Sequence, residues 1–208
     1  MHLAWGLGLS GFSIEGMKQS VSVIDLEAQP VSRVWGGTRI AERLGLQTVE
    51  PIGELWLAYD QNRIRSGRWA GRTLAEVLPQ LGADFIGRTP YSKYGLELPL
   101  LIKFLDTAEW LSVQVHPDDT YAHTVEAASG FHGKTEAWYI LEGEGEIVYG
   151  LLEPMARESL AKAAQEGSIW NCLRREWVVS EQVIPVPAGT IHALGPGLLL
   201  YEVQQRSD

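Results

Sequence analysis

The sequence predicts a mainly β domain, a β-barrel with helical insertions, on the basis of three observations. From Leu98 onwards, apolar runs rich in β-branched and aromatic residues follow one another closely. Gly and Pro residues, which favour turns, separate these runs. Among the 208 residues, 45% are hydrophobic and 21% are charged, which is the composition of a folded globular domain large enough for one core.

Two strands and a short helix are expected before residue 60. Residues 21–26 alternate in polarity and include β-branched side chains, which predicts a strand. Residues 38–44 have helical spacing and are followed by Gly45, a residue that often ends helices. Residues 52–59 predict the second strand.

A helical insertion is expected at about residues 68–90. Thr73 and Glu76 have the spacing of a capping box, so a helix should begin there and end near Gly82. Residues 88–98 contain many turn formers and are predicted to form a loop.

The second half of the chain is expected to supply most of the barrel. The Gly-Glu-Gly-Glu sequence at 143–146 predicts a tight hairpin between two of its strands. Further helical insertions are predicted at about 118–129 and 155–175, the latter capped by Ser159. The predicted strands are 98–106, 110–116, 136–143, 145–152, 178–189 and 197–205.

We expect a single domain over residues 17–208, preceded by a disordered or spuriously assigned leader at 1–16. The leader is apolar and rich in Gly but has no basic segment before its apolar stretch, which argues against a signal peptide. Met17 is therefore an alternative start of translation.

The overall charge excludes some partners. Acidic residues number 26 against 17 basic ones, and a net charge of -9 would repel nucleic acids and anionic membranes. An anionic substrate would consequently need a locally basic site. The single cysteine, Cys172, excludes an intramolecular disulfide and a thiolate metal cluster, so a reducing cytoplasm is the expected compartment.

Several potential metal ligands have a suggestive spacing. Gln114 and His116 lie two residues apart in a predicted strand and would share a face with Ser112. Glu136 opens a later strand, and His192 follows a Pro/Gly turn that could direct its imidazole inward. Two imidazoles, one carboxylate and one amide oxygen can bind a divalent ion and leave a position open for substrate.

These residues resemble the two motifs of the cupin superfamily. The Pro-x-Gly-x-x-His motif is matched by Pro187, Gly189 and His192, and the end of the other motif by Glu136 and Gly143. Where cupins usually carry His-x-His, this chain has Gln-Val-His at 114–116, and glutamine at that place resembles the type I phosphomannose isomerases.

The resemblance to that isomerase family covers most of the chain after Ser32. It implies a zinc-dependent cupin enzyme, with one Zn²⁺ per chain, that interconverts mannose 6-phosphate and fructose 6-phosphate through a cis-enediol. The hexose 6-phosphate is then the partner expected, and the sequence says nothing of oligomeric state. The matching segments are VWGG at 34–37, IGELW at 52–56, LIKFLDTAEWLSVQVHPDD at 101–119, GKTEAWYIL at 133–141 and PAGTIHALGPGLLLYEVQQRSD at 187–208.

The same resemblance implies roles for individual residues. Zinc would be held by the four ligands named above, Lys134 would lie beside the substrate, and Glu54 and Trp35 would line its pocket. Lys103 and Ser112 would recognise the phosphate. Four of them have a simpler structural explanation. Lys134 could be a solvated lysine in a turn, Glu54 could merely pair with an arginine, Lys103 could extend its ammonium out of an apolar strand, and Trp35 could be core packing.

The resemblance leaves two alternatives open. Family members continue beyond the segment that ends at Asp208 into a stretch with a catalytic arginine, so the chain could be a metal- and sugar-phosphate-binding remnant with impaired catalysis. Another cupin activity, such as an iron oxygenase, fits less well because Gln114 departs from a two-histidine, one-carboxylate triad. His123 and His132 are expected on the surface.

Overall fold

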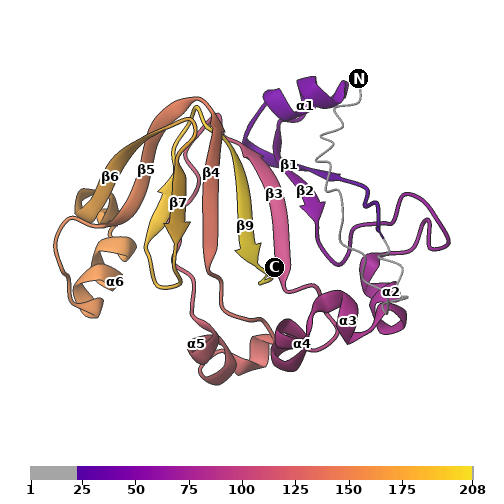
Figure 1. Cartoon of the computed structure of the whole chain (residues 1–208). Coiled ribbons are helices and arrows are strands. Elements are labelled where there is room, and N and C mark those ends of the chain that lie inside the picture. The colour runs from indigo at the N-terminus through magenta and orange to yellow at the C-terminus, as the bar shows by residue number, and fades with distance from the viewer. Residues whose placement is uncertain (1–22, 208) are drawn as a thin grey trace, which may run out of the picture.

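The computed structural model describes residues 23–207, and the division between a leader and a domain beginning at residue 17 lies outside them. Its elements are β1 (Gln29–Gly37), α1 (Arg39–Leu44), β2 (Ile52–Ala58), α2 (Leu74–Leu81), α3 (Ala83–Ile86), α4 (Arg88–Tyr94), β3 (Leu100–Asp106), α5 (Asp119–Thr124), η1 (Ala127–Ser129), β4 (Glu136–Glu142), β5 (Glu144–Leu151), α6 (Arg157–Gln165), η2 (Ile169–Cys172), β6 (Leu173–Val179), β7 (Val183–Val186), β8 (His192–Leu194) and β9 (Leu199–Gln205) (Figure 1).

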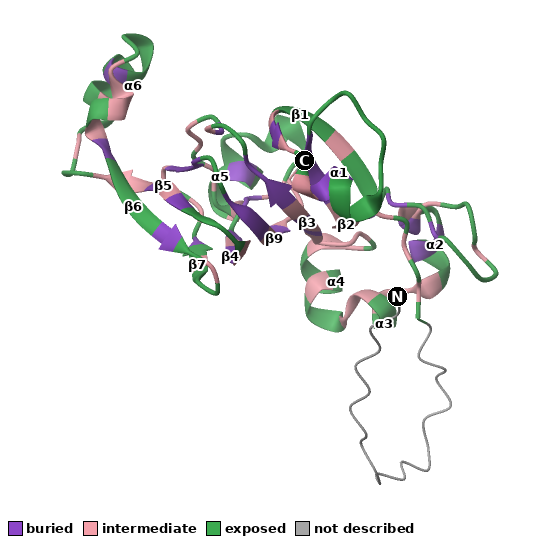
Figure 2. Ribbon diagram, turned by 90° about the horizontal axis from the view of Figure 1, so that it is seen from above, coloured by how far each residue is buried: buried purple, intermediate pink, exposed green. Residues whose placement is uncertain are grey.

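The strands form two antiparallel sheets, which confirms the prediction of a mainly β fold. One sheet has the order β1-β2-β3-β9-β4-β7, and the other has the order β6-β5-β8. Buried apolar side chains from both sheets pack together in one core, and the burial is visible along β3 and β9 in Figure 2. Among them are Leu105, Trp138, Ile140, Ile147, Leu194 and Leu200.

The register of the larger sheet places polar side chains side by side. Lys103 on β3 is directly opposite Glu202 on β9, and Trp138 on β4 is opposite the same Glu202 from the other side. Glu136 begins β4 two residues before Trp138 and therefore shares its face. Charged groups from β3, β9 and β4 thus lie close together in the centre of the larger sheet.

The helices lie around the sheets (Figure 1). Helix α1 ends at Gly45, which has a φ of 65°, as expected. Helix α2 begins with the predicted capping box between Thr73 and Glu76 and ends at Gly82. Within residues 23–207, no helix combines the length and apolar character needed to cross a membrane.

Four predictions of local structure were wrong in the connecting segments. The strand predicted at 178–189 is divided by a turn at 180–181, which separates β6 from β7. The described part of 21–26 forms only one bridge, between Leu26 and Ile64, and the first strand begins at Gln29. Part of the loop predicted at 88–98 is helix α4, where contacts of its last turn with Asp119 supply stability that local propensity does not. Helix α6 begins at Arg157, so Ser159 lies inside the helix and does not cap it.

The predicted hairpin at 143–146 is absent because β4 and β5 belong to different sheets. Gly143 has a φ of 89° and redirects the chain from one sheet to the other. A Cβ atom at this position would lie 2.1 Å from the carbonyl oxygen of Gly197. A glycine at position 143 therefore allows the backbone to pass close to the backbone of Gly197.

The predicted strand at 110–116 is an irregular extended segment. Leu111 donates its N–H to the oxygen of Leu194, and Gln114 donates to the oxygen of His192, both at 2.9 Å. The donors are three residues apart and the acceptors two, so one residue is extra and the ladder is interrupted, as in a β-bulge. The segment nevertheless stays attached to β8.

Candidate metal centre and active site

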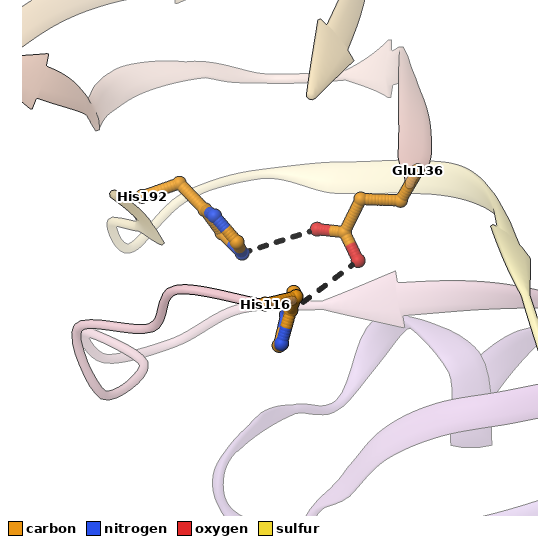
Figure 3. A group of neighbouring side chains, drawn as sticks. All are labelled: His116, Glu136 and His192. Atoms are coloured by element: carbon orange, nitrogen blue, oxygen red, sulfur yellow. Dashed lines mark ion pairs between the residues drawn. The ribbon is translucent and has the colours of Figure 1, made fainter. Parts of the chain in front are cut away.

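Three of the four expected metal ligands lie together at one end of the sheets. One donor atom each from His116, Glu136 and His192 lies within 4.8 Å of the others. The Nε2 atom of His192 is 3.2 Å from Oε1 of Glu136, and Nε2 of His116 is 3.9 Å from Oε2 (Figure 3). Ligands of one tetrahedral zinc ion are separated by roughly 3.3 Å, so these distances are close to those of a shared ion.

The backbone explains why these side chains converge. Glu136 is the first residue of β4, and His192 is the first residue of β8. His116 lies on the bulged segment, which is joined to β8 by paired backbone hydrogen bonds between Gln114 and His192. Gln114 is the fourth expected ligand, and it lines the same cavity as Glu136 and His192.

The protonation states of two of these residues favour cation binding. Nδ1 of His192 is 2.8 Å from the carbonyl oxygen of Thr190, which can only accept, so Nδ1 carries a proton. Nε2 faces Glu136 and is the nitrogen that would bind a metal, which would displace the proton between Nε2 and the carboxylate. Burial disfavours the charged form of Glu136, but the hydrogen bond to His192 and the charge of Lys134 outweigh it and hold the pKa of the carboxyl well below its usual range. Glu136 is therefore an anion at neutral pH.

The residues present fit a divalent cation. Oε2 of Glu136 is buried and accepts no hydrogen bond within the described residues. The ammonium of Lys134 lies 3.1 Å from this oxygen and 3.2 Å from Nε2 of His116. A positive charge thus already lies against two of the donor atoms, and a buried carboxylate with spare acceptor capacity beside two imidazoles is a suitable ligand set.

A cavity of about 280 Å³ opens beside these residues. Three basic and three acidic side chains line it, so it is far less acidic than the chain as a whole. Every expected substrate-contacting residue is on its wall, namely Trp35, Glu54, Lys103, Ser112 and Lys134. Its other lining residues include Arg33, Trp56, Leu105, Leu111, Trp138 and Glu202.

Glu202 was missed by the sequence analysis. Its side chain is buried, Oε2 is 3.1 Å from the ammonium of Lys103, and Oε1 accepts a hydrogen bond from Nε1 of Trp138 at 3.2 Å. Burial raises the pKa of this carboxyl, Lys103 opposes the rise, and the nearby Glu136 adds to it. The signal was an acidic residue on the inward face of an apolar strand, in phase with Leu200.

Glu54 lines the cavity and is also held by its neighbours. Its Oε2 accepts hydrogen bonds from Nε1 of Trp56 at 2.6 Å and from the guanidinium of Arg33 at 3.3 Å. The pairing with an arginine and the place in the pocket, which the sequence presented as alternatives, therefore coexist. Arg33 and Trp56 are two further cavity residues that the sequence analysis did not identify.

Comparison with known proteins identifies the family to which the chain belongs. Residues 23–155 match the family described as phosphomannose isomerase type I, catalytic domain. The chain belongs to this family. His116 and Glu136 lie within the matched residues, and His192 lies beyond them.

Individual relatives are similar over most of the chain. The mannose-6-phosphate isomerase of Streptococcus mutans is 35% identical over 190 residues, which is 88% of this chain and 57% of that protein. The Bacillus subtilis mannose-6-phosphate isomerase ManA is 38% identical over 182 residues, which is 85% of this chain and 55% of that protein. The chain therefore spans little more than half the length of these phosphomannose isomerases.

A solved structure of the family confirms the fold. The crystal structure of the Bacillus subtilis mannose 6-phosphate isomerase superposes with a TM-score of 0.75 at 34% identity, covering 89% of this chain and 59% of that one. A putative mannosephosphate isomerase from Archaeoglobus fulgidus has a TM-score of 0.74 at 23% identity and shares the fold.

Proposed function

We propose that this chain carries a zinc-dependent site for the interconversion of mannose 6-phosphate and fructose 6-phosphate. The observation that supports this most strongly is the convergence of His116, Glu136 and His192, two of which, Glu136 and His192, line a cavity that contains basic side chains. Family membership supplies the substrate class, since relatives named mannose-6-phosphate isomerase align over 85–88% of the chain.

Gln114, His116, Glu136 and His192 would hold one Zn²⁺ per chain. When bound, zinc would polarise the carbonyl of the open-chain sugar and the adjacent hydroxyl, which acidifies the hydrogen that must move. Glu136 supplies the only anionic ligand of this set. Two neutral imidazoles and an amide oxygen leave most of the charge of the ion available to the substrate.

The protein groups would carry out the proton transfer between carbons 1 and 2 through a cis-enediol. Lys134 is buried beside the ligands, and Glu54 is held in place by Trp56 and Arg33, so both can contact a sugar in the cavity. A carboxylate fixed by two donors has few competing orientations, which favours proton transfer at a defined carbon.

Basic and hydroxyl groups on the cavity wall suit the phosphate. Lys103 and Ser112 line the cavity, and Lys103 is already paired with Glu202. Arg33, whose side chain is 41% exposed, adds a guanidinium that can bind two phosphate oxygens at once. Trp35 and Trp56 give the sugar apolar walls.

The test is isomerisation of mannose 6-phosphate by the zinc-loaded chain, followed by the appearance of fructose 6-phosphate. We expect turnover that is abolished by chelation and by His116→Ala. Val115→Ala, which removes an exposed side chain next to this ligand, is the matched control and should retain activity. Tight binding of zinc and of mannose 6-phosphate without turnover would instead identify a binding domain that has lost catalysis.

A further inference from the structure

A second cluster of metal-ligating side chains lies outside the cavity. Asp119 and His123 lie four residues apart on α5 and therefore share a face of the helix, and His132 lies on the loop after η1. One donor atom from each of the three lies within 4.8 Å of the others. From this geometry we infer that Asp119, His123 and His132 form a second divalent-metal site, for an ion of the Zn²⁺, Cu²⁺ or Ni²⁺ type.

The two imidazoles are arranged as a pair of ligands. Nε2 of His123 is 2.7 Å from Nδ1 of His132, and the rings meet edge to face, with an angle of 86° between their planes. Two nitrogens bound to one zinc ion would be roughly 3.3 Å apart. A small increase in the distance between the two nitrogens would therefore make room for the ion. The proton now shared by the two nitrogens would leave with solvent as the metal enters.

The outer contacts of His132 fix the tautomer that a metal needs. Its Nε2 forms a close hydrogen bond with Oε1 of Glu97, and Oε2 of Glu97 accepts a hydrogen bond from Arg206 at 2.8 Å. Because the carboxylate of Glu97 accepts a hydrogen bond from the Nε2–H of His132, Nδ1 is left as an acceptor directed at His123. A carboxylate behind a histidine is the arrangement that orients histidine ligands in metal sites.

Asp119 supplies the negative charge. It accepts hydrogen bonds from the N–H of Gly133 at 2.9 Å and from the hydroxyl of Tyr94 at 3.2 Å, and it pairs closely with Lys93. Its carboxylate is thus oriented in advance, but Lys93 competes with a metal for it. Removing that ammonium should therefore strengthen metal binding, which no purely structural role of the cluster would predict.

The site is separate in position from the first. It uses nitrogen and carboxylate donors on a helix and a loop, His123 is exposed, and no cavity residue takes part. An ion bound there would connect α5 to the loop segment that begins at His132 and continues through Gly133 to Lys134. It would thereby brace the loop that carries Lys134 without contacting the sugar.

Titration of the metal-free chain with Zn²⁺ alone tests the inference by stoichiometry. We expect two ions per chain in the unaltered protein, one in the His123→Gln/His132→Gln variant, and one in Glu136→Gln, which disables the first site. Glu126→Gln, an exposed carboxylate on the same segment, should leave two. Equal zinc content in the unaltered protein and in the double histidine variant would overturn the inference, whatever happens at the first site.

Affinity at the second site provides an independent check. Glu97→Gln should weaken Zn²⁺ binding there by about 10- to 100-fold through the altered support of His132. Lys93→Met should strengthen it, on the order of tenfold, because one competing positive charge is lost. An unchanged affinity in both variants would show that the cluster is held together by hydrogen bonds alone.

Discussion

Lys103 and Glu202 face each other directly across strands β3 and β9, both buried, with the ammonium 3.1 Å from the carboxylate. Their position is set by the register of two central strands of the larger sheet. The pairing of strands β3 and β9 therefore fixes the positions of this positive and this negative charge beside the cavity. Movements of loops would leave both charges in place.

Breaking this pair should destabilise the fold. Lys103→Met leaves Glu202 buried without its main counter-charge, and we expect unfolding free energy to fall by about 3–5 kcal/mol. The double variant Lys103→Met/Glu202→Gln removes the uncompensated charge and should recover most of the loss. Urea unfolding of both variants measures this, and a double variant no more stable than the single one would contradict the assignment.

Glu136 should dominate the affinity of the first metal site. Glu136→Gln keeps the shape of the side chain but removes the only anionic ligand, so Zn²⁺ affinity there should fall by more than 100-fold, beyond the effect of losing a supporting contact. Glu144→Gln, an exposed carboxylate at the start of β5, is the control. Competition with a chromophoric chelator gives both constants.

Removal of zinc should lower thermal stability. A ligand that binds only the folded chain and is present at a thousand times its dissociation constant adds about 4.1 kcal/mol, which for this size corresponds to roughly 8–16 °C in Tm. Calorimetry with and without a chelator measures the shift. In the His123→Gln/His132→Gln background the shift belongs to the first site alone, and adding His192→Ala should abolish it.

Gly143 and Gly150 form a matched pair for testing the crossing between the sheets. Both have positive φ angles, 89° and 86°, so alanine is strained at either position by about 1–2 kcal/mol. Gly150 has open space where a Cβ would go, whereas at Gly143 it would meet a carbonyl oxygen at 2.1 Å. Gly143→Ala should therefore be clearly the more destabilising, and equal losses would refute the close approach.

The contact between Asp119 and Lys93 should make stability depend on acid pH in metal-free buffer. Burial opposes ionisation of Asp119, but Lys93 and the N–H of Gly133 outweigh it and lower the pKa of the carboxyl. The stabilisation is therefore present above about pH 4, the unfolded value, and is lost as pH falls through the lower folded value. Asp119→Asn should cost at most about 1 kcal/mol at pH 7 and progressively less as the pH is lowered below about 4, as measured by urea unfolding over this pH range.

The sequence predicted the parts of the fold that local chemistry determines. The capping box at Thr73 and the helix end at Gly45 depend on neighbouring residues, and both were correct. The hairpin at 143–146 was wrong because the direction of the chain after Gly143 depends on the distant backbone of Gly197. Helix α4 was missed for a similar reason, since Asp119 holds its last turn from 25 residues away.

In the candidate site, too, the residues that belong to local sequence motifs were predicted, and those that depend on distant contacts were missed. His116, Glu136 and His192 were recognised because their motifs are contiguous in sequence, and the structure brings them together. Glu202 and Arg33 were missed, since their significance arises only from the strand register that sets them against Lys103 and Glu54. A single acidic residue in an apolar strand was the available signal for Glu202.

His192 owes its orientation to main-chain atoms, because its Nδ1 proton is held by the carbonyl oxygen of Thr190. Every amino acid carries such an oxygen. A substitution at position 190 would therefore keep the orientation of the His192 imidazole. Other side chains around the cavity can change to suit other sugars while this metal ligand keeps its position.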